Sequence, residues 1–480
     1  MNIVSSFQFL VISLFISLYI KAMEQTPNDF LDTTFGDNGV VTTNFGMNSG
    51  TVNKVVSSIH VRMQPDGKIL MVGDAYKDFT SKPKGVSCAL ARYNRDGSLD
   101  THFGFGGTIM LSLGQGNADT FGIDCVVQKD GKIIVVVRIF DRKDGFGNAA
   151  LIRVHYNGNL DSSFGSEGMV KEKLGKNWSN YFKAVLQDDG KIVAVGNQGF
   201  KEGIDALDTL YCSFFISRYN SNGTPDISFG QNGKVQTIVQ VTDRPKPRVA
   251  GKEGDEALGA VLQSDGKIVT VGLSDDCTSF GDLAKAESVS SDSALVRYDS
   301  QGKPDTSFGT DKNGMVITSA SKHCNFFVDV IVQPDGKILA LGTARNTTTQ
   351  KGEFLLVRYN LDGTLDTTFG KDRTGIVLTP VGTDHAFAKN IALQKDGKIL
   401  VTGSVQWDKY KKFTLVRYTS EGILDTTFGP AKDGILVTSL GNGDDRSFAI
   451  AVQEDGKMVV AGDSFNGRCF DFALVRYNVL

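Results

Sequence analysis

Short apolar runs separated by polar turns fill most of the chain, and one turn marks the period of this pattern. Asp-Gly-Lys stands between apolar runs such as residues 260–262 and 268–272. The turn occurs seven times, 59 to 76 residues apart, and Gln precedes its Asp by two positions each time. Its Asp residues are Asp66, Asp130, Asp189, Asp265, Asp335, Asp396 and Asp455. Two short β-branched runs joined by a tight Asp-Gly connection predict a β-hairpin, because Gly adopts the positive φ that the turn requires.

Each hairpin is followed by two further strand-like elements. The third run reads Leu-Val-Arg-Tyr or a close variant, and an Asp-x-x-Phe-Gly segment and a fourth short run come after it. The repeated Arg residues are Arg92, Arg153, Arg218, Arg297, Arg358, Arg417 and Arg476. The Asp residues of the closing segment are Asp32, Asp100, Asp161, Asp226, Asp305, Asp366 and Asp425. Four strands in consecutive order per repeat predict the blade of a propeller.

The two ends of the chain are out of phase with the repeat in a complementary way. The first element, residues 31–45, is a closing segment with a fourth strand alone, whereas the chain ends on a third strand at residues 473–478. We therefore predict an all-β, seven-bladed β-propeller of four-stranded antiparallel blades, closed by pairing of the N-terminal strand with the C-terminal blade. The alternative, an open solenoid, leaves an incomplete sheet at each end.

The Asp-Gly-Lys-Ile hairpin, the Leu-Val-Arg-Tyr-Asn run and the Leu-Asp-Thr-Thr-Phe-Gly segment resemble the delta-60 repeat, a family of bacterial propeller-like repeats of unknown function. The resemblance extends from Leu31 to Asn478 in seven copies. Departures from it exist: Val154 and His155 replace the usual Tyr-Asn, and Val137 replaces the Gly that ends the second strand elsewhere. The resemblance implies a propeller and an exported protein, and it implies no activity.

The N-terminal residues differ from the repeats. Residues 9–20 are mostly apolar, a run that suits a signal peptide better than a membrane span of about 20 residues. We predict a signal peptide over residues 1–22 and a single propeller domain over residues 23–480, in a secreted or periplasmic protein. An uncleaved anchor is the alternative. No other stretch is long and apolar enough to cross a bilayer, so we expect no membrane span in the mature chain.

Composition narrows the classes of partner. A net charge of −3 and a pI near 6.0 argue against a nucleic-acid binder, which would carry a basic stripe. The six Cys form no Cys-x-x-Cys motif, and they are Cys88, Cys125, Cys212, Cys277, Cys324 and Cys469. Disulfides between neighbouring repeats and unpaired buried thiols both stay open. We expect a monomer without a cofactor.

Residues that recur in every repeat are expected to serve the structure. The Asp of Asp-x-x-Phe-Gly and the Arg of the third strand occur once per unit, so we predict that they pair, because a buried guanidinium needs a carboxylate partner. Seven equivalent pairs do not make a catalytic site, since catalysis needs one asymmetric constellation.

Differences in length are confined to one set of connections. In a four-stranded meander the first and third connections leave from one face of the ring, and the second and inter-blade connections leave from the other. The first and third are uniform here, whereas the other set contains the long segments 74–87, 197–211, 238–256 and 273–292. Because binding loops sit on rigid scaffolds, we expect partners at the face with the long loops. Residues 244–248 form a basic, Pro-stiffened stretch there, which is a solvated linker or a contact.

One position of the first strand varies in a way that suggests a binding site. Four residues before each repeated Gln stand His60, Asp124, Lys183, Gly259, Asp329, Asn390 and Ala449. Strand alternation places this position in or beside the central tunnel, and we expect it near the mouth with the long loops. The predicted ligand-binding residues are His60, Asp124, Lys183, Asp329 and Asn390. A hydrated tunnel lining without a ligand is the alternative. We predict no metal site, because one His and two Asp lie on different blades.

Motifs for catalysis are missing. The chain has no Gly-x-Ser-x-Gly, no His-Glu-x-x-His and no Gly-rich phosphate loop, and it has only five His. We therefore assign no catalytic residues and expect a non-enzymatic binding or scaffold propeller that engages a protein or glycan. The alternative is a hydrolase or lyase of saccharides or lactones that works in the central funnel through Asp124, Asp329 and His60, because propeller glycosidases take their acids from separate blades.

Overall fold

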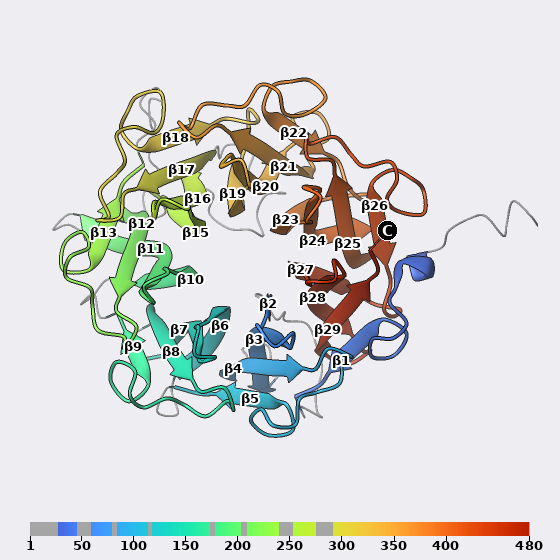
Figure 1. Ribbon diagram of the computed structural model, residues 1–480, viewed down its shortest axis with the longest axis horizontal. Coiled ribbons are helices and arrows are strands. Elements are labelled where there is room, and N and C mark those ends of the chain that lie inside the picture. Colours follow the sequence, from blue (N-terminus) through green and yellow to red (C-terminus); the bar gives the residue numbers. More distant parts are fainter. Residues whose placement is uncertain are drawn as a thin grey trace, which may run out of the picture.

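In the computed structural model, seven β-sheets surround a central axis (Figure 1). The structure describes residues 27–45, 59–78, 84–113, 118–143, 145–172, 178–202, 209–239, 253–274 and 291–479. Each sheet is a meander of four antiparallel strands that runs outward from the axis, and blade three carries one additional short strand. The predicted fold, a seven-bladed propeller of four-stranded blades, is confirmed.

The strands occupy equivalent places in the seven blades. The innermost strands of blades one to seven are β2 (His60–Met63), β6 (Ala118–Val127), β10 (Ser179–Leu186), β15 (Glu256–Leu262), β19 (Asn325–Val332), β23 (Ala386–Leu393) and β27 (Asp445–Val452). The second strands are β3 (Ile69–Asp78), β7 (Ile133–Asp141), β11 (Ile192–Glu202), β16 (Ile268–Ser274), β20 (Ile338–Arg345), β24 (Ile399–Trp407) and β28 (Met458–Phe465).

The outer half of each blade follows the same order. The third strands are β4 (Lys84–Tyr93), β8 (Phe146–Val154), β12 (Thr209–Tyr219), β17 (Asp292–Tyr298), β21 (Gly352–Tyr359), β25 (Tyr410–Tyr418) and β29 (Phe470–Tyr477). The outermost strands are β5 (Thr108–Leu111), β9 (Met169–Lys171), β13 (Lys234–Thr237), β18 (Met315–Thr318), β22 (Ile376–Thr379), β26 (Ile435–Thr438) and, in blade seven, β1 (Val40–Thr43). β14 (Glu253–Gly254) pairs with β12 in parallel, and η1 (Pro27–Phe30) is a short 3-10 turn.

Blade seven is completed by the start of the chain. β1 pairs with β29 over four residues, with Val40 opposite Val475 and Thr43 opposite Phe472. The Nε of Arg476 donates to Oδ2 of Asp32 at 2.7 Å, which holds the preceding segment in the same blade. Figure 1 shows this N-terminal strand beside the C-terminal blade. The predicted closure is therefore confirmed, and it leaves only outer strands as sheet edges.

The Asp-Gly-Lys turns share one hydrogen-bond pattern. In blade one, Gln64 N–H donates to the Lys68 carbonyl and Gly67 N–H donates to the Gln64 carbonyl, both at 2.8 Å. Lys68 N–H donates to Oδ1 of Asp66 at 3.0 Å. Gly67 has a φ of 82°, in the left-handed region that the turn needs. These turns and the Asp-x-x-Phe-Gly segments form the end of the ring that we call the tight-turn face.

The repeated Arg and Asp pair in all seven blades, as predicted. The Arg Nε donates to Oδ2 of the Asp at 2.7 to 2.9 Å. The Lys of the tight turn approaches the same Asp to within 2.8 to 4.0 Å. The guanidinium carbon lies 4.3 to 4.8 Å from the ring centre of the buried Phe. Each blade thus contains an Arg–Asp–Lys triad that covers a phenyl ring.

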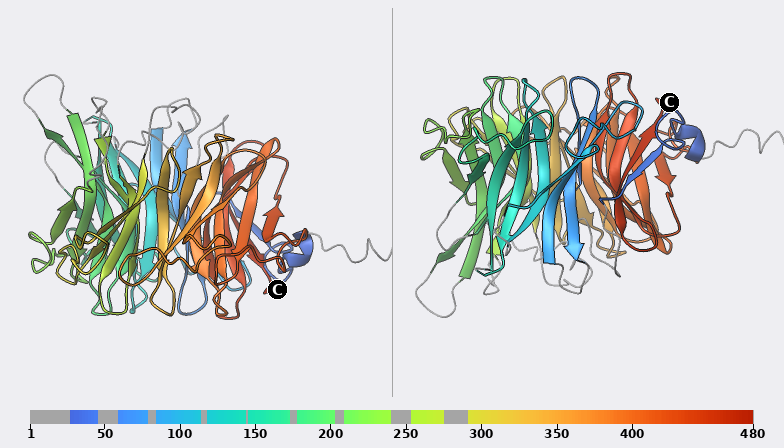
Figure 2. Two further views of the ribbon diagram at one scale, coloured as in Figure 1. Left: turned by 90° about the horizontal axis from the view of Figure 1, so that it is seen from above. Right: turned by 90° about the horizontal axis from the view of Figure 1, so that it is seen from below.

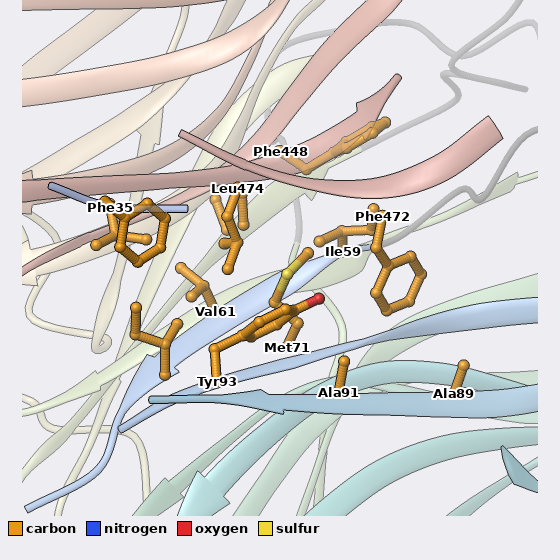
Figure 3. Close-up of a cluster of buried hydrophobic side chains, with 14 of the residues drawn as sticks. Phe35, Ile59, Val61, Met71, Ala89, Ala91, Tyr93, Phe448, Phe472 and Leu474 are labelled. Carbon is orange, nitrogen blue, oxygen red and sulfur yellow. The ribbon is translucent and has the colours of Figure 1, made fainter. Parts of the chain in front are cut away.

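The triads also join neighbouring blades. Nη1 of Arg153 donates to the carbonyl of Ser221 in the next blade at 2.5 Å, and Nη1 of Arg218 donates to that of Ser300 at 2.6 Å. Apolar side chains fill the space between the sheets. Figure 3 shows the cluster in which Val61 of blade one lies close to Leu474 of blade seven. The core is therefore divided among the contacts between blades.

The opposite end of the ring, which we call the long-loop face, differs from the sequence prediction in detail. Segments 74–87 and 197–211, expected as loops, are mostly strand, because β3, β4, β11 and β12 extend to 10 or 11 residues. The hairpin of β11 and β12 projects beyond the other blades (Figure 2). Residues 240–252, including the basic stretch 244–248, and residues 275–290 lie outside the described part of the chain.

Two further predictions can be compared with the described residues. None of the helices among them could cross a membrane. Cys88, Cys125, Cys212, Cys324 and Cys469 form no disulfide with one another, and Cys277 lies outside the described residues. The predicted signal peptide, residues 1–22, lies outside them as well.

Candidate functional site

The predicted polar position lies on the innermost strand of each blade and follows a bulge in six of them. In β10, for example, the register with β11 shifts between Tyr181 and Lys183, so one extra residue bulges from the strand. Lys183, Asp329 and Asn390 are each the fifth of eight residues in their strands. The position therefore lies midway along the tunnel and not near its mouth, because the inner strands start further toward the long-loop face than the apolar pattern indicates.

Two of the predicted residues meet between blades one and two. Nδ1 of His60 lies 3.4 Å from Oδ1 of Asp124, which is fully buried. The same oxygen accepts a hydrogen bond from Nη2 of Arg62 at 2.7 Å, and Nε of Arg62 donates to the Cys125 carbonyl at 2.9 Å. The other carboxylate oxygen accepts the N–H of Ala184 at 3.2 Å. Asp124 is therefore bound on both oxygens.

The other three predicted residues form a second group. Nζ of Lys183 donates to Oδ1 of Asp329 at 3.1 Å, and Nδ2 of Asn390 donates to Oδ2 of the same carboxylate. Lys183 reaches Asp329 across blade four, which has Gly259 at this position. A Cβ there would lie only 2.9 Å from the Asp329 Cα. The structure thus brings all five predicted residues into two groups, and within the described part of the chain the buried Nδ1 of His60 has no hydrogen-bond partner. Whether they bind a ligand stays a prediction.

These side chains also hold the bulges of the neighbouring blades. Asp124, Asp329 and Asn390 each accept the backbone N–H of the residue after this position in the next blade. The donors are Ala184 at 3.2 Å, Ile391 at 3.4 Å and Ile450 at 2.9 Å. A bulge disrupts strand pairing and leaves backbone groups that need other partners. The polar position therefore has a structural task that sequence alone did not indicate.

In the first group, the pKa values of His60 and Asp124 lie well below neutral pH. Burial lowers the pKa of His60 to about 4 despite the nearby Asp124 carboxylate, so the imidazole is neutral. Burial disfavours the Asp124 carboxylate, but Arg62 and its other neighbours outweigh this and hold its pKa below the ordinary value. A neutral imidazole beside a permanently ionised, paired carboxylate is a poor acid–base pair.

Sequence reasoning missed Arg62, which completes the first group. It stands two residues after His60, where the other six blades have Val, Ile or Ala. A charged residue at a position that is apolar in the other six blades could have been noticed in the sequence. Its pairing with Asp124 could not, because that contact depends on the distance between blades one and two.

A second polar set lies on the long-loop side of the ring. Oδ1 of Asp74 accepts the N–H of Gly122 at 2.8 Å, whereas its Oδ2 has no hydrogen-bond partner in the described part of the chain. The Nε of Arg138 likewise has none among those residues, and its guanidinium carbon lies 4.6 Å from the ring centre of Phe121. Burial raises the pKa of Asp74 to about 7, although Gly122 and Arg138 oppose this. Blades one and two thus each carry a buried polar atom that lacks a hydrogen bond within the described residues.

Two more residues extend this set to blades three and four. The Oδ1 of Asn180 has no partner among the residues described, and its Nδ2 donates to Oδ1 of Asn197 at 3.3 Å. Nδ2 of Asn197 donates to Oε1 of Glu256 at 2.9 Å. Burial raises the pKa of Glu256 to about 7. Asp74, Arg138, Asn180 and Glu256 therefore lie in four consecutive blades, each on the long-loop side of the polar position, and we call these four residues the long-loop rim.

A cavity of about 720 Å³ lies at the other end of the tunnel. Its walls come from blades seven, one, two and three, and they include Arg62, Met63, Val126, Leu186 and Val452. Arg62 connects this cavity to the first polar group. The sequence analysis expected a pocket at the opposite mouth, since the uniform turns gave no sign of a hollow beneath them.

No group of three His, Cys, Asp or Glu within the described ranges is arranged to hold a metal ion. The tunnel carboxylates are instead paired with cations and amides, as described above. The side chains of the tunnel and its two ends thus provide hydrogen-bonding and ionic contacts, a cavity with apolar walls and the long-loop rim.

Several solved structures are similar to the chain. The polysaccharide lyase Uly1 matches with 10% identity and a TM-score of 0.47, over 91% of this chain and 93% of that one. The β-propeller domain of the Trilobed protease from Pyrococcus furiosus matches with 12% identity and a TM-score of 0.40, over 89% and 95%. The exo-β-1,3-galactanase 1,3Gal43A from Clostridium thermocellum matches with 10% identity and a TM-score of 0.32, over 90% and 86%.

A family model matches the repeats themselves, whereas no curated protein matches the chain. The model is described as a domain of unknown function (DUF5122) beta-propeller, and it matches residues 64–103, 128–164, 263–308, 333–369, 394–428 and 453–479. The matched stretches begin at the repeated Gln of every blade except blade three. The chain is therefore similar, over six of its seven blades, to a propeller repeat family of unknown function, and the match does not extend to the delta-60 name.

Proposed function

We propose that this protein is a non-enzymatic binding or scaffold propeller that engages a protein or glycan through its long-loop face. The observation that carries the proposal is the long-loop rim, where Asp74, Arg138 and Asn180 keep polar atoms without partners among the residues described. Buried polar atoms of this kind are satisfied when a ligand or water supplies the missing hydrogen bond. The variation in connection length at the same face supports the proposal, since variable loops on a rigid scaffold are where binding residues concentrate.

The tunnel supports binding better than turnover. Asp124 is bound on both oxygens and paired with Arg62, and the His60 beside it is neutral. We propose that His60, Asp124, Lys183, Asp329 and Asn390 form the floor of the binding site and contact only a ligand that reaches deep into the tunnel. The protein is further proposed to be secreted or periplasmic after loss of residues 1–22, with repeats of the delta-60 type. Mass spectrometry of the mature chain tests the cleavage.

One observation favours a second candidate, a hydrolase or lyase of saccharides or lactones. Glu256 lies on an inner strand, is half-buried, and has a pKa raised to about 7 by burial. A carboxylic acid with such a pKa can donate a proton near neutral pH. The rival enzyme would therefore use Glu256 as its acid, and Asp124 or Asp329 would be its carboxylates.

Binding and turnover are separated by one set of assays. Retention on a panel of defined immobilised polysaccharides is measured together with release of reducing ends and of unsaturated products. We expect retention without product. A variant with residues 275–290 replaced by an Asn-Gly turn is expected to lose retention with an unchanged melting profile.

Product formation that disappears in Glu256→Gln and Asp124→Asn variants would establish the enzyme and overturn the binding proposal. Retention that survives the loop replacement would show that residues 275–290 do not contribute to the binding site. If no polysaccharide is retained, the glycan class is excluded and a protein partner is left.

A further inference from the structure

The cavity at the tight-turn end of the tunnel is independent of the long-loop face. At about 720 Å³ it has the size of a small-molecule site, for which 300–1,000 Å³ is typical. It is lined by the ends of inner strands and by the turns of blades seven and one, including Gln64, Gln453 and Lys457. All its lining residues belong to the described part of the chain. We propose that this cavity binds a small amphipathic carboxylate, with an apolar body along the walls and its carboxylate toward Arg62.

The walls are apolar because of a regular feature of the inner strands. In six blades the last two residues of the strand are both aliphatic and both half-buried. They are Val126 with Val127, Val185 with Leu186, Val261 with Leu262, Ile331 with Val332, Ala392 with Leu393, and Ala451 with Val452. A closed belt of partly exposed aliphatic side chains is unfavourable in water, and an apolar ligand removes that surface from water.

Blade one breaks this belt and gives the cavity its polar end. Arg62 and Met63 occupy the two positions there, and the side chain of Arg62 is 26% exposed. Arg62 uses one bond from Nε and one from Nη2 to reach Cys125 and Asp124, and its Nη1 donates to the Val61 carbonyl at 3.2 Å. A guanidinium has five N–H groups, so two are left for a ligand carboxylate.

The repeated Gln does not have the same hydrogen-bond partners in every blade. In blades three, four and five, Oε1 of the repeated Gln accepts a hydrogen bond from the triad Arg at 3.4 to 3.5 Å. The Oε1 atoms of Gln64 and Gln453, which flank the cavity, have no partner among the residues that the structure describes, and the same holds for Gln128 and Gln394, which do not line it. Gln64 is only 4% exposed. An amide that turns its NH₂ or its carbonyl toward a bound ligand would gain the missing bond.

The charged side chains at the opening of the cavity, on the tight-turn face, favour an anion. Lys457 and Arg476 share the single carboxylate of Asp32, at 2.8 and 2.7 Å. In the other six blades the turn Lys also pairs with the Asp of its own turn, whereas Lys457 has no such pair with Asp455 among the described residues. The lining acids Glu454 and Asp455 are exposed at the surface, where solvent screens them.

The depth of the cavity sets the length of the ligand. Arg62 lies three residues from Pro65 at the turn, which corresponds to about 10 Å along a strand. A medium-chain acid such as octanoate spans this distance. Its carboxylate would lie near Arg62 and its tail between Met63, Val126, Leu186 and Val452.

Titration calorimetry of the full-length mature protein with octanoate tests the proposal, and octanol serves as the uncharged comparison. We expect octanoate to bind about tenfold more tightly than octanol. Arg62→Met is expected to remove this preference while octanol binding persists, and Arg62→Lys is expected to retain part of it. Equal affinities of the native protein for octanoate and octanol would overturn the carboxylate assignment.

A steric variant tests the location without touching Asp124. Leu186→Trp fills the cavity and is expected to abolish binding of both probes. Leu393→Trp is its matched control, because Leu393 ends the inner strand of blade six in the same way but does not line the cavity. Octanoate binding that survives Leu186→Trp, or that is lost equally in Leu393→Trp, would contradict the proposed site. Circular dichroism and the urea midpoint verify that each variant is folded.

Discussion

The two faces of the ring use the same repeat in opposite ways. On the tight-turn face, seven Arg–Asp–Lys triads repeat with nearly constant distances and hold each blade to the next. On the long-loop face, equivalent positions carry different side chains, such as Asp74, Arg138 and Asn197. In a repeat protein, uniform positions reveal what holds the fold together. Function is therefore expected where the repeat is broken, at the long-loop rim and at Arg62.

The largest effect is expected from the triad that closes the ring. Asp32→Ala leaves Arg476 and Lys457 without their carboxylate and weakens the attachment of β1, so the free energy of unfolding should fall by about 3–5 kcal/mol. Urea unfolding measures this. Asp37→Ala is the control, since Asp37 is exposed and its side chain accepts a hydrogen bond from the neighbouring Asn38, which is exposed as well. A loss for Asp32→Ala no larger than that of the control would mean that the closing triad does not hold the ring.

The two faces should respond to pH with opposite signs. Hydrogen bonds from Ser228 and the charge of Arg218 outweigh burial and lower the pKa of Asp226 to about 2. Because its pKa is depressed on folding, its contribution is present above pH 4 and is lost as the pH falls toward 2. Burial raises the pKa of Asp74 to about 7, so its contribution is complete below pH 4 and is lost as the pH rises to 7.

Asp74→Asn tests the second half of this contrast. The amide oxygen can still accept the Gly122 N–H but carries no charge, so the variant should be more stable than the native protein by about 2–4 kcal/mol at pH 8 and similar at pH 4. Urea unfolding at several pH values measures the difference. A difference that does not change with pH would show that Asp74 is not the titrating group.

A smaller effect is expected where the polar position holds a bulge. Asn390→Ala removes the bond to Asp329 and leaves the N–H of Ile450 without its acceptor, so about 1–3 kcal/mol of stability should be lost. Blade seven has Ala449 at this position, which shows that Ala fits the strand. A loss below about 0.5 kcal/mol would indicate that water replaces both bonds.

The smallest effect is expected at the Tyr that ends the third strand, whose hydrogen-bond partner is Thr in blade four and Glu in blade three. Tyr298 donates to Oγ1 of Thr237 at 2.8 Å, whereas Tyr219 donates to the carboxylate of Glu172. Tyr298→Phe should cost about 0.5–1.5 kcal/mol and Tyr219→Phe about 1.5–3 kcal/mol, because hydrogen bonds to charged groups are stronger. Thermal or urea unfolding measures both losses. Equal losses of stability in the two variants would show that the carboxylate partner of Tyr219 makes no difference.

The fold was predictable because it depends on local signals repeated seven times. The Gly of each Asp-Gly turn fixes a hairpin, and the fourth strand at Val40 has no blade unless it joins Val475. The polar position was located by counting back from the Gln. Its surroundings were not predictable, since a bulge before Lys183 or Asp329 is not written in the apolar pattern.

Contacts between blades were the other missing information. Arg62 meets Asp124, and Lys183 meets Asp329 across Gly259, only because the ring brings these strands together. β11 and β12 are also longer than the sequence predicted. Polar residues such as Gln198 and Lys201 occur in protruding strands as well as in loops, so the sequence did not distinguish the two. The cavity at the tight-turn face results from how the blades pack together, and no spacing of residues in the sequence predicts it.

The contrast between the faces is tested most directly within blade four. Asp305→Ala removes the triad carboxylate on the tight-turn face, and replacement of residues 275–290 by Asn-Gly shortens the connection on the long-loop face. Urea unfolding of both variants is predicted to show a loss of about 3 kcal/mol for Asp305→Ala and almost no change for the loop replacement. A stable Asp305→Ala protein beside a destabilised loop variant would contradict the claim that the triads of the tight-turn face, and not the connections of the long-loop face, hold the ring together.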